Sequence, residues 1–190
     1  MKTAYVVMPC ITFLETNLLI SLGFKAVSSP KDADVILFTG GMRDIHPAYY
    51  NQEITGADCG NFPQERTEEE LQIYNSYKNT KKFLGICRGL QFLNIVHGGT
   101  LIQHINGHSG GYGGYHSLYD PVTLLELGSV NSSHHQCIGE STGTPLAISK
   151  DSVVEAMVWE NSLGVQWHPE YSQEGEFSFD YFKTLVEKHL

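Results

Sequence analysis

The sequence predicts an α/β fold, a three-layer sandwich in which helices cover both faces of a mostly parallel central sheet. Two observations lead to this prediction. Short apolar runs, clearest at residues 34–39 and 83–86, alternate along the chain with segments whose apolar side chains recur at helical spacing. These runs are apolar without a polar face, which is typical of strands covered on both sides in a parallel sheet.

The composition is that of a globular protein and argues against two classes of partner. With 190 residues, of which 41% are hydrophobic and 17% charged, we expect one domain, residues 1–190. The net charge is −9, and no Lys/Arg cluster is present to follow a phosphate backbone, so we expect no nucleic acid. The longest apolar runs are too short to cross a bilayer, so we expect no membrane partner. The first residues predict a strand rather than a signal peptide.

The four cysteines form no CxxC pair, which disfavours both a zinc site and a dense disulfide framework. Free thiols in the cytoplasm are the simplest interpretation. The nine histidines are scattered, and the adjacent pair His134–His135 is weak evidence for a metal site, so we expect no metal.

The first half of the chain reads as strands and helices in alternation. Strands are expected at residues 5–8, 24–27 and 34–39, with helices at 13–22 and 67–78. The second helix begins with capping-box character, and its glutamates at 68–70 suit the helix dipole and are expected to face solvent. Gly40–Gly41 follows a strand, where backbone N–H groups can approach a ligand, although a plain turn is the commoner explanation.

The second half adds further strands and a terminal helix. A strand at 83–86 leads into a buried helix at 90–96, and residues 177–190 form an amphipathic helix. Further strands are expected at 100–105, 116–127, 145–148, 153–159 and 163–167, the second of them broken at Asp120–Pro121. The glycine-rich stretch 107–115 is either a mobile lid over a site or an ordinary surface loop.

Gly85 and Gly89 flank Cys87 at the junction of a strand and a helix. Glycines two residues before and after a nucleophile are what a sharp strand-to-helix turn requires. Such a turn exposes the sulfur at the sheet edge and aims the positive end of a helix dipole at it, which favours thiolate. A lone cysteine would otherwise be interpreted as a packing residue.

His168, Pro169 and Glu170 follow the strand predicted at 163–167, and the proline should stop that strand at His168. The one-residue separation can place both polar side chains on one side of the chain. Glu170 could then accept the Nδ1 proton of His168 and leave Nε2 free to take the proton of Cys87. Alone the motif is weak, but with the cysteine turn it predicts acyl transfer.

Together, residues 85–91 and 164–170 resemble the class I glutamine amidotransferase domain, which has a flavodoxin-like fold. Residues 40–50, 66–70 and 131–136 are more similar to the γ-glutamyl hydrolase branch, peptidase family C26, which includes γ-glutamyl-γ-aminobutyrate hydrolases. The resemblance implies a cysteine-dependent hydrolase of γ-glutamyl amide bonds.

The resemblance also implies roles for individual residues. Cys87 is expected as nucleophile, His168 as general base and acid, and Glu170 as the carboxylate that orients the histidine. Backbone N–H groups of Gly41 and Arg88 are expected to form the oxyanion hole. The candidates for substrate binding are Gln91, Asn131, Ser132, His135, Asp44 and Arg66.

Two other functions are compatible with the same residues. A glutaminase subunit would deliver ammonia to a separate synthetase or amidoligase chain. A non-enzymatic binding module on this fold would be expected to lack part of the Cys-His-Glu set, and all three residues are present. No cofactor is expected for either enzymatic alternative.

Overall fold

The computed structural model describes residues 1–7, 13–55, 64–110 and 114–190. Within these residues the main sheet has nine strands in the order β2-β1-β3-β4-β11-β10-β9-β6-β7. The first five of these are mutually parallel. They are β2 (Lys25–Ala26), β1 (Thr3–Val7), β3 (Val35–Phe38), β4 (Lys82–Ile86) and β11 (Ser162–Val165).

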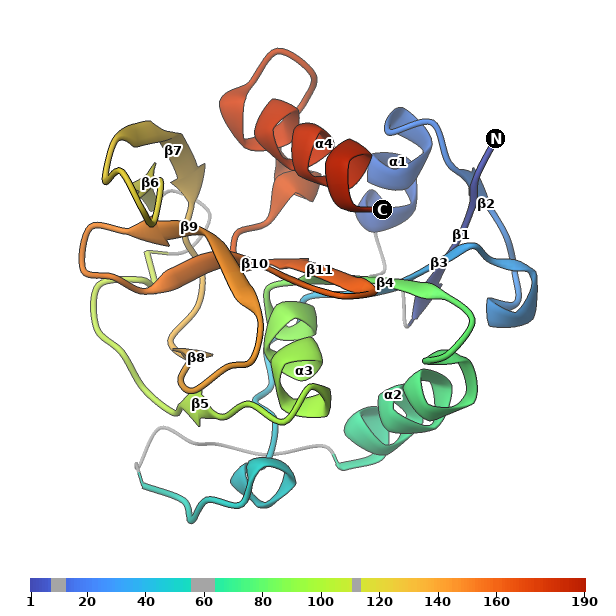
Figure 1. Ribbon diagram of the computed structural model, residues 1–190, viewed down its shortest axis with the longest axis horizontal. Coiled ribbons are helices and arrows are strands. Elements are labelled where there is room, and N and C mark those ends of the chain that lie inside the picture. Colours follow the sequence, from blue (N-terminus) through green and yellow to red (C-terminus); the bar gives the residue numbers. More distant parts are fainter. Residues whose placement is uncertain (8–12, 56–63, 111–113) are drawn as a thin grey trace.

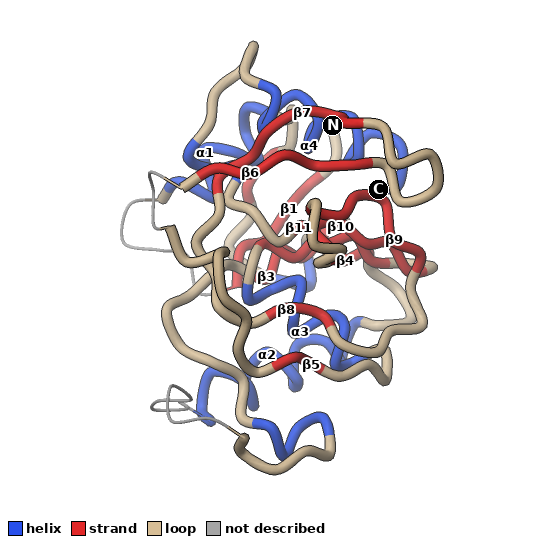
Figure 2. Tube along the Cα trace, turned by 90° about the vertical axis from the view of Figure 1, so that its left-hand side faces the viewer, coloured by secondary structure: helices blue, strands red, loops and turns tan. Residues whose placement is uncertain are grey.

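Antiparallel pairing extends the sheet beyond β11. The added strands are β10 (Val154–Trp159), β9 (Thr144–Ser149), β6 (Tyr115–Tyr119) and β7 (Glu126–Asn131). A separate ribbon pairs β5 (Leu101–Ile102) with β8 (Cys137–Ile138). In Figure 2 this ribbon lies beside α3, whereas β7 lies beside α4 at the opposite end of the molecule.

Helices cover both faces of the sheet, as the sequence predicts (Figure 1). The helices α1 (Leu14–Ser21) and α4 (Phe177–His189) lie on one face, and α2 (Gln64–Tyr77) and α3 (Arg88–Val96) lie on the other. Short 3-10 turns occur at η1 (Pro30–Asp32), η2 (Pro47–Tyr50) and η4 (Pro169–Tyr171). The predicted three-layer α/β fold is thereby confirmed.

The apolar side chains separate into two cores, one on each face. One core joins Leu19 of α1 and Phe182 of α4 to Leu84 and Trp167. The other joins α2 and α3 to the opposite face through aromatic contacts, with Phe38 and Phe92 rings 4.6 Å apart. The residues of β3 and β4 alternate between the two cores, which explains why their sequences carry no polar face.

Several predicted elements differ from those observed. Helix α2 begins at Gln64 rather than at 67, and the predicted strand 100–105 is only Leu101–Ile102. The predicted strand 116–127 is two strands of a hairpin, whose turn contains the expected break at Asp120–Pro121. Strand β11 ends at Val165 rather than at His168. Cys10, Cys59 and part of the glycine-rich stretch lie outside the described residues.

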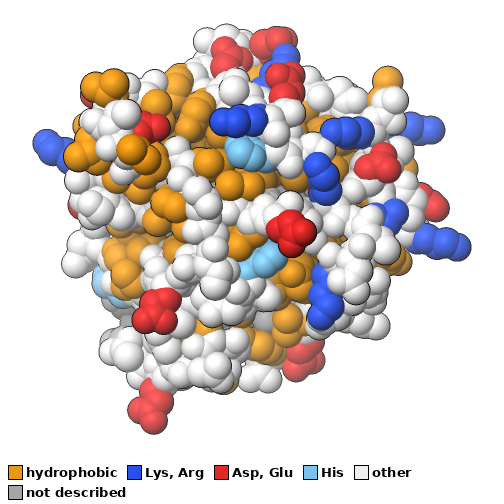
Figure 3. All heavy atoms as spheres, viewed as in Figure 1, with side chains coloured by type: hydrophobic (Ala, Val, Ile, Leu, Met, Phe, Trp, Pro, Cys, Tyr) orange, Lys and Arg blue, Asp and Glu red, His pale blue; other side chains and the backbone are white. Residues whose placement is uncertain are grey.

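Figure 3 shows one face of the surface, on which acidic and basic side chains are interspersed without a continuous basic patch. None of the helices in the described ranges is long and apolar enough to span a bilayer.

Candidate active site

Cys87 sits in a sharp turn between β4 and α3. Its backbone has φ 51° and ψ −106°, a conformation that side-chain-bearing residues rarely adopt. Both flanking glycines are required by close packing, because a Cβ added at Gly85 would lie 2.5 Å from the carbonyl carbon of Gly89. A Cβ at Gly89 would collide with the carbonyl oxygen of Phe38. The glycines therefore let α3 approach the sheet directly behind the cysteine, as the sequence predicts.

Strand pairing brings the two halves of the site together. Ile86 is paired with Val165 in parallel register, and the Cys87 N–H donates to the Val165 carbonyl over 2.8 Å. The chain beyond β11 therefore runs alongside the turn that carries the sulfur. Gly40 lies beyond the end of β3, next to the side chains of Cys87 and His168. A Cβ added at Gly40 would be 2.7 Å from His168 Cε1 and 3.7 Å from Cys87 Cβ.

His168 is held by both its backbone and its ring. Asn131 accepts from the His168 N–H over 2.9 Å and donates its amide to the His168 carbonyl over 2.8 Å. His168 Nδ1 lies 2.6 Å from a Glu170 carboxylate oxygen. Because the carboxylate can only accept when ionised, Nδ1 carries the proton and Nε2 is left for the sulfur. Trp167, fully buried, anchors this segment in the core beneath α4.

The electrostatics of the site favour a protonated imidazole. Burial by itself lowers the pKa of His168, but the negative charge of Cys87 and a hydrogen bond to it, together with Glu170, outweigh burial and raise that pKa to about 11. An imidazolium beside a sulfur stabilises the thiolate, which is the nucleophilic form. The arrangement therefore corresponds to an ion pair of the kind that activates cysteine nucleophiles.

A cavity of about 230 Å³ opens beside Cys87. Of the six residues predicted to bind substrate, Gln91, Asp44 and His135 line it, and so does Gly41. The His135 Nε2 atom lies 3.0 Å from an Asp44 carboxylate oxygen. Burial raises the pKa of Asp44, although the hydrogen bond to His135 and the charges of His135 and Arg88 oppose this effect.

The other three predicted residues do not line the cavity but support its walls. Asn131 holds the backbone of His168, and the Ser132 hydroxyl donates to the His108 carbonyl over 2.8 Å. The Arg66 guanidinium donates to the carbonyl oxygens of Thr39 and Gly40 at 2.9 and 3.0 Å. Asn131 and Arg66 therefore position His168 and Gly40, whereas Ser132 holds the segment of His108, and none of the three lines the cavity.

A buried carboxylate joins the two arginines of the site. Glu70 is fully buried and pairs with Arg66 at 2.9 Å and with Arg88 at 2.5 Å. Glu68 and Glu69 are exposed, so the expectation that residues 68–70 all face solvent is wrong for Glu70. The pairing fixes the start of α3 relative to the Gly40–Gly41 turn, the two places from which oxyanion donors are predicted.

Several residues in the cavity or in contact with its lining were not predicted from the sequence. Gln166 donates to the Cys87 sulfur at 3.5 Å and lies 3.3 Å from the Gln91 amide. Ser109, Ser133, His134 and Gln136 line the cavity beside it. The polar cluster at 130–136 was the available signal for the last three, since polar side chains are unusual next to strands. Gln166 carried no such signal because it lies within a mostly apolar strand sequence.

The model of the peptidase C26 family matches residues 26–170 of the sequence. The chain belongs to the peptidase C26 family. Within the described residues this C26 chain places Cys87, His168 and Glu170 at one edge of the sheet, where the carboxyl ends of parallel strands bind ligands in open α/β folds.

Two relatives show how far this C26 chain extends along other proteins. A Mycobacterium tuberculosis protein provisionally named a glutamine amidotransferase is 35% identical over 80% of this chain and 54% of its own length. The carbamoyl phosphate synthase small chain of Helicobacter pylori is 28% identical over 90% of this chain and 45% of its own length. This chain therefore spans about half the length of these relatives.

Solved structures agree with the fold of this C26 chain. A glutamine amidotransferase of Thermotoga maritima superimposes with a TM-score of 0.66 at 16% identity, covering 98% of this chain and 84% of that one. The glutamine amidotransferase of Methylobacillus flagellatus gives 0.62 at 14% identity, covering 100% of this chain and 77% of that one. At these identities the likeness shows the glutamine amidotransferase fold.

Proposed function

We propose that this chain is a cysteine-dependent hydrolase of γ-glutamyl amide bonds that works through a γ-glutamyl thioester on Cys87. The observation that carries the proposal is the strained cysteine turn facing an imidazole that is paired with Glu170 at 2.6 Å. Membership of peptidase C26 supports amide-bond hydrolysis as the class of reaction. A free thiol is needed, which fits a reducing compartment such as the cytoplasm.

The proposed first half-reaction forms the thioester. The Cys87 thiolate attacks the γ-carbonyl carbon of the substrate, and the carbonyl π electrons move to oxygen. The backbone N–H groups of Gly41 and Arg88 bind this oxyanion; Arg88 is the first residue of α3, where an N–H has no partner within the helix. As the C–N bond breaks, His168 Nε2 donates its proton to the leaving nitrogen, which departs as ammonia or an amine.

The proposed second half-reaction restores the enzyme. His168, now neutral, takes a proton from water, and the resulting hydroxide equivalent attacks the thioester carbon. The C–S bond breaks, the thiolate returns, and glutamate leaves. Glu170 holds the imidazole in one tautomer through both steps and stabilises its positive charge.

We assign the glutamyl α-amino and α-carboxylate groups to the side chains that line the cavity. Asp44 is the candidate for the ammonium group, since a bound cation would offset the desolvation that raises its pKa. Gln91 and His135 are the candidates for hydrogen bonds to the carboxylate. A cavity of about 230 Å³ favours a small γ-glutamyl compound over a polypeptide.

The test compares two buried cysteines. Cys87→Ala should abolish release of glutamate from a panel of γ-glutamyl amides, because it removes the attacking atom. Cys137 is free and buried, burial raises the pKa of its thiol to about 12, and Cys137→Ala should retain activity. Rapid quenching and peptide mass spectrometry should find a glutamyl adduct on Cys87. Activity that survives Cys87→Ala would overturn the proposal.

A second function uses the same residues to supply ammonia to a separate synthetase or amidoligase chain. It is favoured by the 28% identity to a protein named as the small chain of a synthase, over 90% of this chain. Kinetics of the purified protein separate the two functions. Turnover of free glutamine with release of ammonia supports the ammonia-supplying role, whereas turnover of γ-glutamyl-amine conjugates alone supports the hydrolase.

A further inference from the structure

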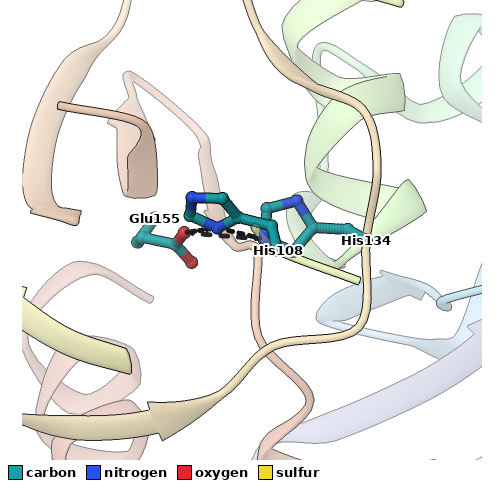
Figure 4. A group of neighbouring side chains, drawn as sticks. All are labelled: His108, His134 and Glu155. Atoms are coloured by element: carbon teal, nitrogen blue, oxygen red, sulfur yellow. Dashed lines mark hydrogen bonds and ion pairs between the residues drawn. The ribbon is translucent and has the colours of Figure 1, made fainter. Parts of the chain in front are cut away.

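Three buried side chains from separate parts of the chain converge beside the cavity (Figure 4). His108 comes from the segment before β6, His134 from the segment between β7 and β8, and Glu155 from β10. Their exposed fractions are 4%, 5% and 0%. Only His134 also lines the cavity, so the cluster lies behind its wall.

Hydrogen bonds to the outer nitrogens fix which ring atoms face one another. His134 Nδ1 lies 2.9 Å from the Gln136 carbonyl, which can only accept, so Nδ1 carries the proton. His108 Nε2 lies 3.1 Å from an Asp151 carboxylate oxygen and carries the proton for the same reason. In the neutral rings, His134 Nε2 and His108 Nδ1 therefore present lone pairs to each other across 3.2 Å.

The Glu155 carboxylate completes the convergence. Its Oε1 atom lies 3.4 Å from His108 Nδ1 and 3.5 Å from His134 Nε2. Two lone pairs and a carboxylate at such separations repel one another unless a cation lies among them. A tetrahedral zinc ion with bonds of about 2.0–2.1 Å has ligand atoms roughly 3.3 Å apart, close to the three observed separations.

We propose that His108 Nδ1, His134 Nε2 and Glu155 Oε1 bind a divalent transition-metal ion, with Zn²⁺ the ion that this ligand set favours. The Asp151 carboxylate and the Gln136 carbonyl form the outer shell that orients the two imidazoles. The pair His134–His135 was a weak signal for a metal in the sequence, from which no metal was expected, because residues 108, 134 and 155 follow no recognised metal-binding spacing. The proposal is independent of the one made for Cys87.

A proton could also neutralise the cluster, and His116 bears on the choice between proton and metal. Glu155 Oε1 lies 3.2 Å from His116 Nε2 as well as near the two proposed ligand nitrogens, so three imidazoles surround one carboxylate oxygen. One shared proton satisfies two of these ring atoms, whereas one metal ion can bind the carboxylate and the rings at once. A metal ion bonds to Glu155 directly, and a ring movement would make His116 its fourth ligand.

The bound ion would have a structural role. It would tie the segments of His108 and His134 to β10, across the wall of the cavity. The Glu155 carbonyl accepts from the Gln166 N–H over 2.7 Å, and the Gln166 side chain reaches Cys87. The ion would therefore hold the wall of the cavity in place without touching the reacting atoms.

Cobalt provides the test, because Co²⁺ in a tetrahedral nitrogen and oxygen site absorbs visible light. Protein stripped with EDTA should bind one equivalent of Co²⁺ with d–d absorption, and one equivalent of Zn²⁺ should displace it. Glu155→Gln and His108→Gln should abolish this stoichiometric binding. Asp151→Asn, at an exposed side chain that leaves all three ligands in place, should weaken binding by about 10–100-fold.

His97→Gln is the matched control. His97 is a partly buried histidine that stacks on Trp159 and contacts the Ser162 hydroxyl, so it belongs to another part of the core. Its replacement should leave Co²⁺ affinity unchanged, and circular dichroism should establish that every variant compared is folded. Absence of saturable binding in the wild type would overturn the proposal. If the wild type and Asp151→Asn bound Co²⁺ with equal affinity, the proposal would also be overturned.

Discussion

Cys87 and His168 show how residue-scale geometry sets reactivity. The cysteine occupies a backbone conformation that costs about 1–3 kcal/mol, which the surrounding packing must offset. In return, the turn keeps the sulfur at the edge of the sheet, where the imidazole of His168 reaches it. The raised pKa of His168 means that the imidazolium persists from acidic pH up to about 11.

This raised pKa predicts how alkylation of Cys87 should vary with pH. In the wild type, the raised pKa of His168 keeps an imidazolium beside the sulfur at neutral pH, so iodoacetamide should modify Cys87 faster there than in His168→Ala. In His168→Ala the stabilising charge is gone. The alkylation rate should then be low at neutral pH and should increase as the pH approaches the pKa of an ordinary thiol, about 8.5. Peptide mass spectrometry would quantify modification at Cys87, and identical profiles would contradict the ion pair.

Much of the site at residue scale could be predicted, because its motifs are local. The glycines around Cys87 and the one-residue spacing of His168 and Glu170 are determined by neighbouring residues along the chain. Gln166 and the pair His108–His134 could not be predicted, since their contacts join segments that only the folded sheet brings together. The chemistry assigned to the predicted residues stays a prediction.

At the scale of elements, helix α2 is attached to the site through Glu70. This fully buried carboxylate pairs with Arg66 and Arg88, and the two arginines in turn hold the Gly40–Gly41 turn and the start of α3. Removing one partner of a buried ion pair leaves uncompensated charge, which costs far more than the loss of an exposed pair. Helix α2 therefore supports the candidate active site, although none of its residues lines the cavity beside Cys87.

We expect Glu70→Gln to lower the free energy of unfolding by about 3–5 kcal/mol, measured by urea denaturation. Glu69→Gln is the matched control, because Glu69 is the preceding residue of the same helix and is exposed. Its effect should stay within about 0.5 kcal/mol. Equal effects of the two substitutions would show that the buried network does not stabilise the fold.

Two of the predicted strands differ from the structure for identifiable reasons. In the predicted strand 116–127, the Asp120 side chain accepts from the N–H groups of Val122 and Thr123, which closes a turn and makes a hairpin. In the predicted strand 100–105, Gln103 instead bonds to the segment near residue 53, with its amide 2.8 Å from the Glu53 carbonyl. Side-chain hydrogen bonds to the backbone thus replaced ladder pairing in both places.

At the scale of the whole molecule, one sheet carries two separate cores. The fold class could be predicted because apolar runs without a polar face require helices on both sides. The antiparallel extension from β10 to β7 could not, since strand order depends on contacts between distant segments. The two tryptophans divide between the cores, with Trp167 under α4 and Trp159 on the side of α3.

This division allows each core to be followed separately during unfolding. Phe182→Ala should cost about 3–5 kcal/mol, because a fully buried ring is removed from the core beneath α4. Trp159→Phe and Trp167→Phe each leave a single tryptophan, whose fluorescence reports on one core. When Phe182→Ala is added to each variant, the urea midpoint measured by the remaining tryptophan should fall by the same amount in both, since a shared sheet couples the cores. A shift confined to Trp167 fluorescence would show independent cores. The exposed residue Ile20 supplies a control, and Ile20→Ala should change stability by less than about 0.5 kcal/mol.

Because β4 and β11 pair in parallel, the distance between the Cys87 sulfur and the His168 imidazole depends on how many residues follow the last paired position in each strand. Phe83 pairs with Ser162 and Ile86 with Val165, so Cys87 follows the last pair by one position and His168 by three. Inserting a single amino acid ahead of either side chain would translate it by about 3.3 Å and turn it to the opposite face. Anyone who lengthens one of these strands by engineering must therefore lengthen its neighbour by the same amount.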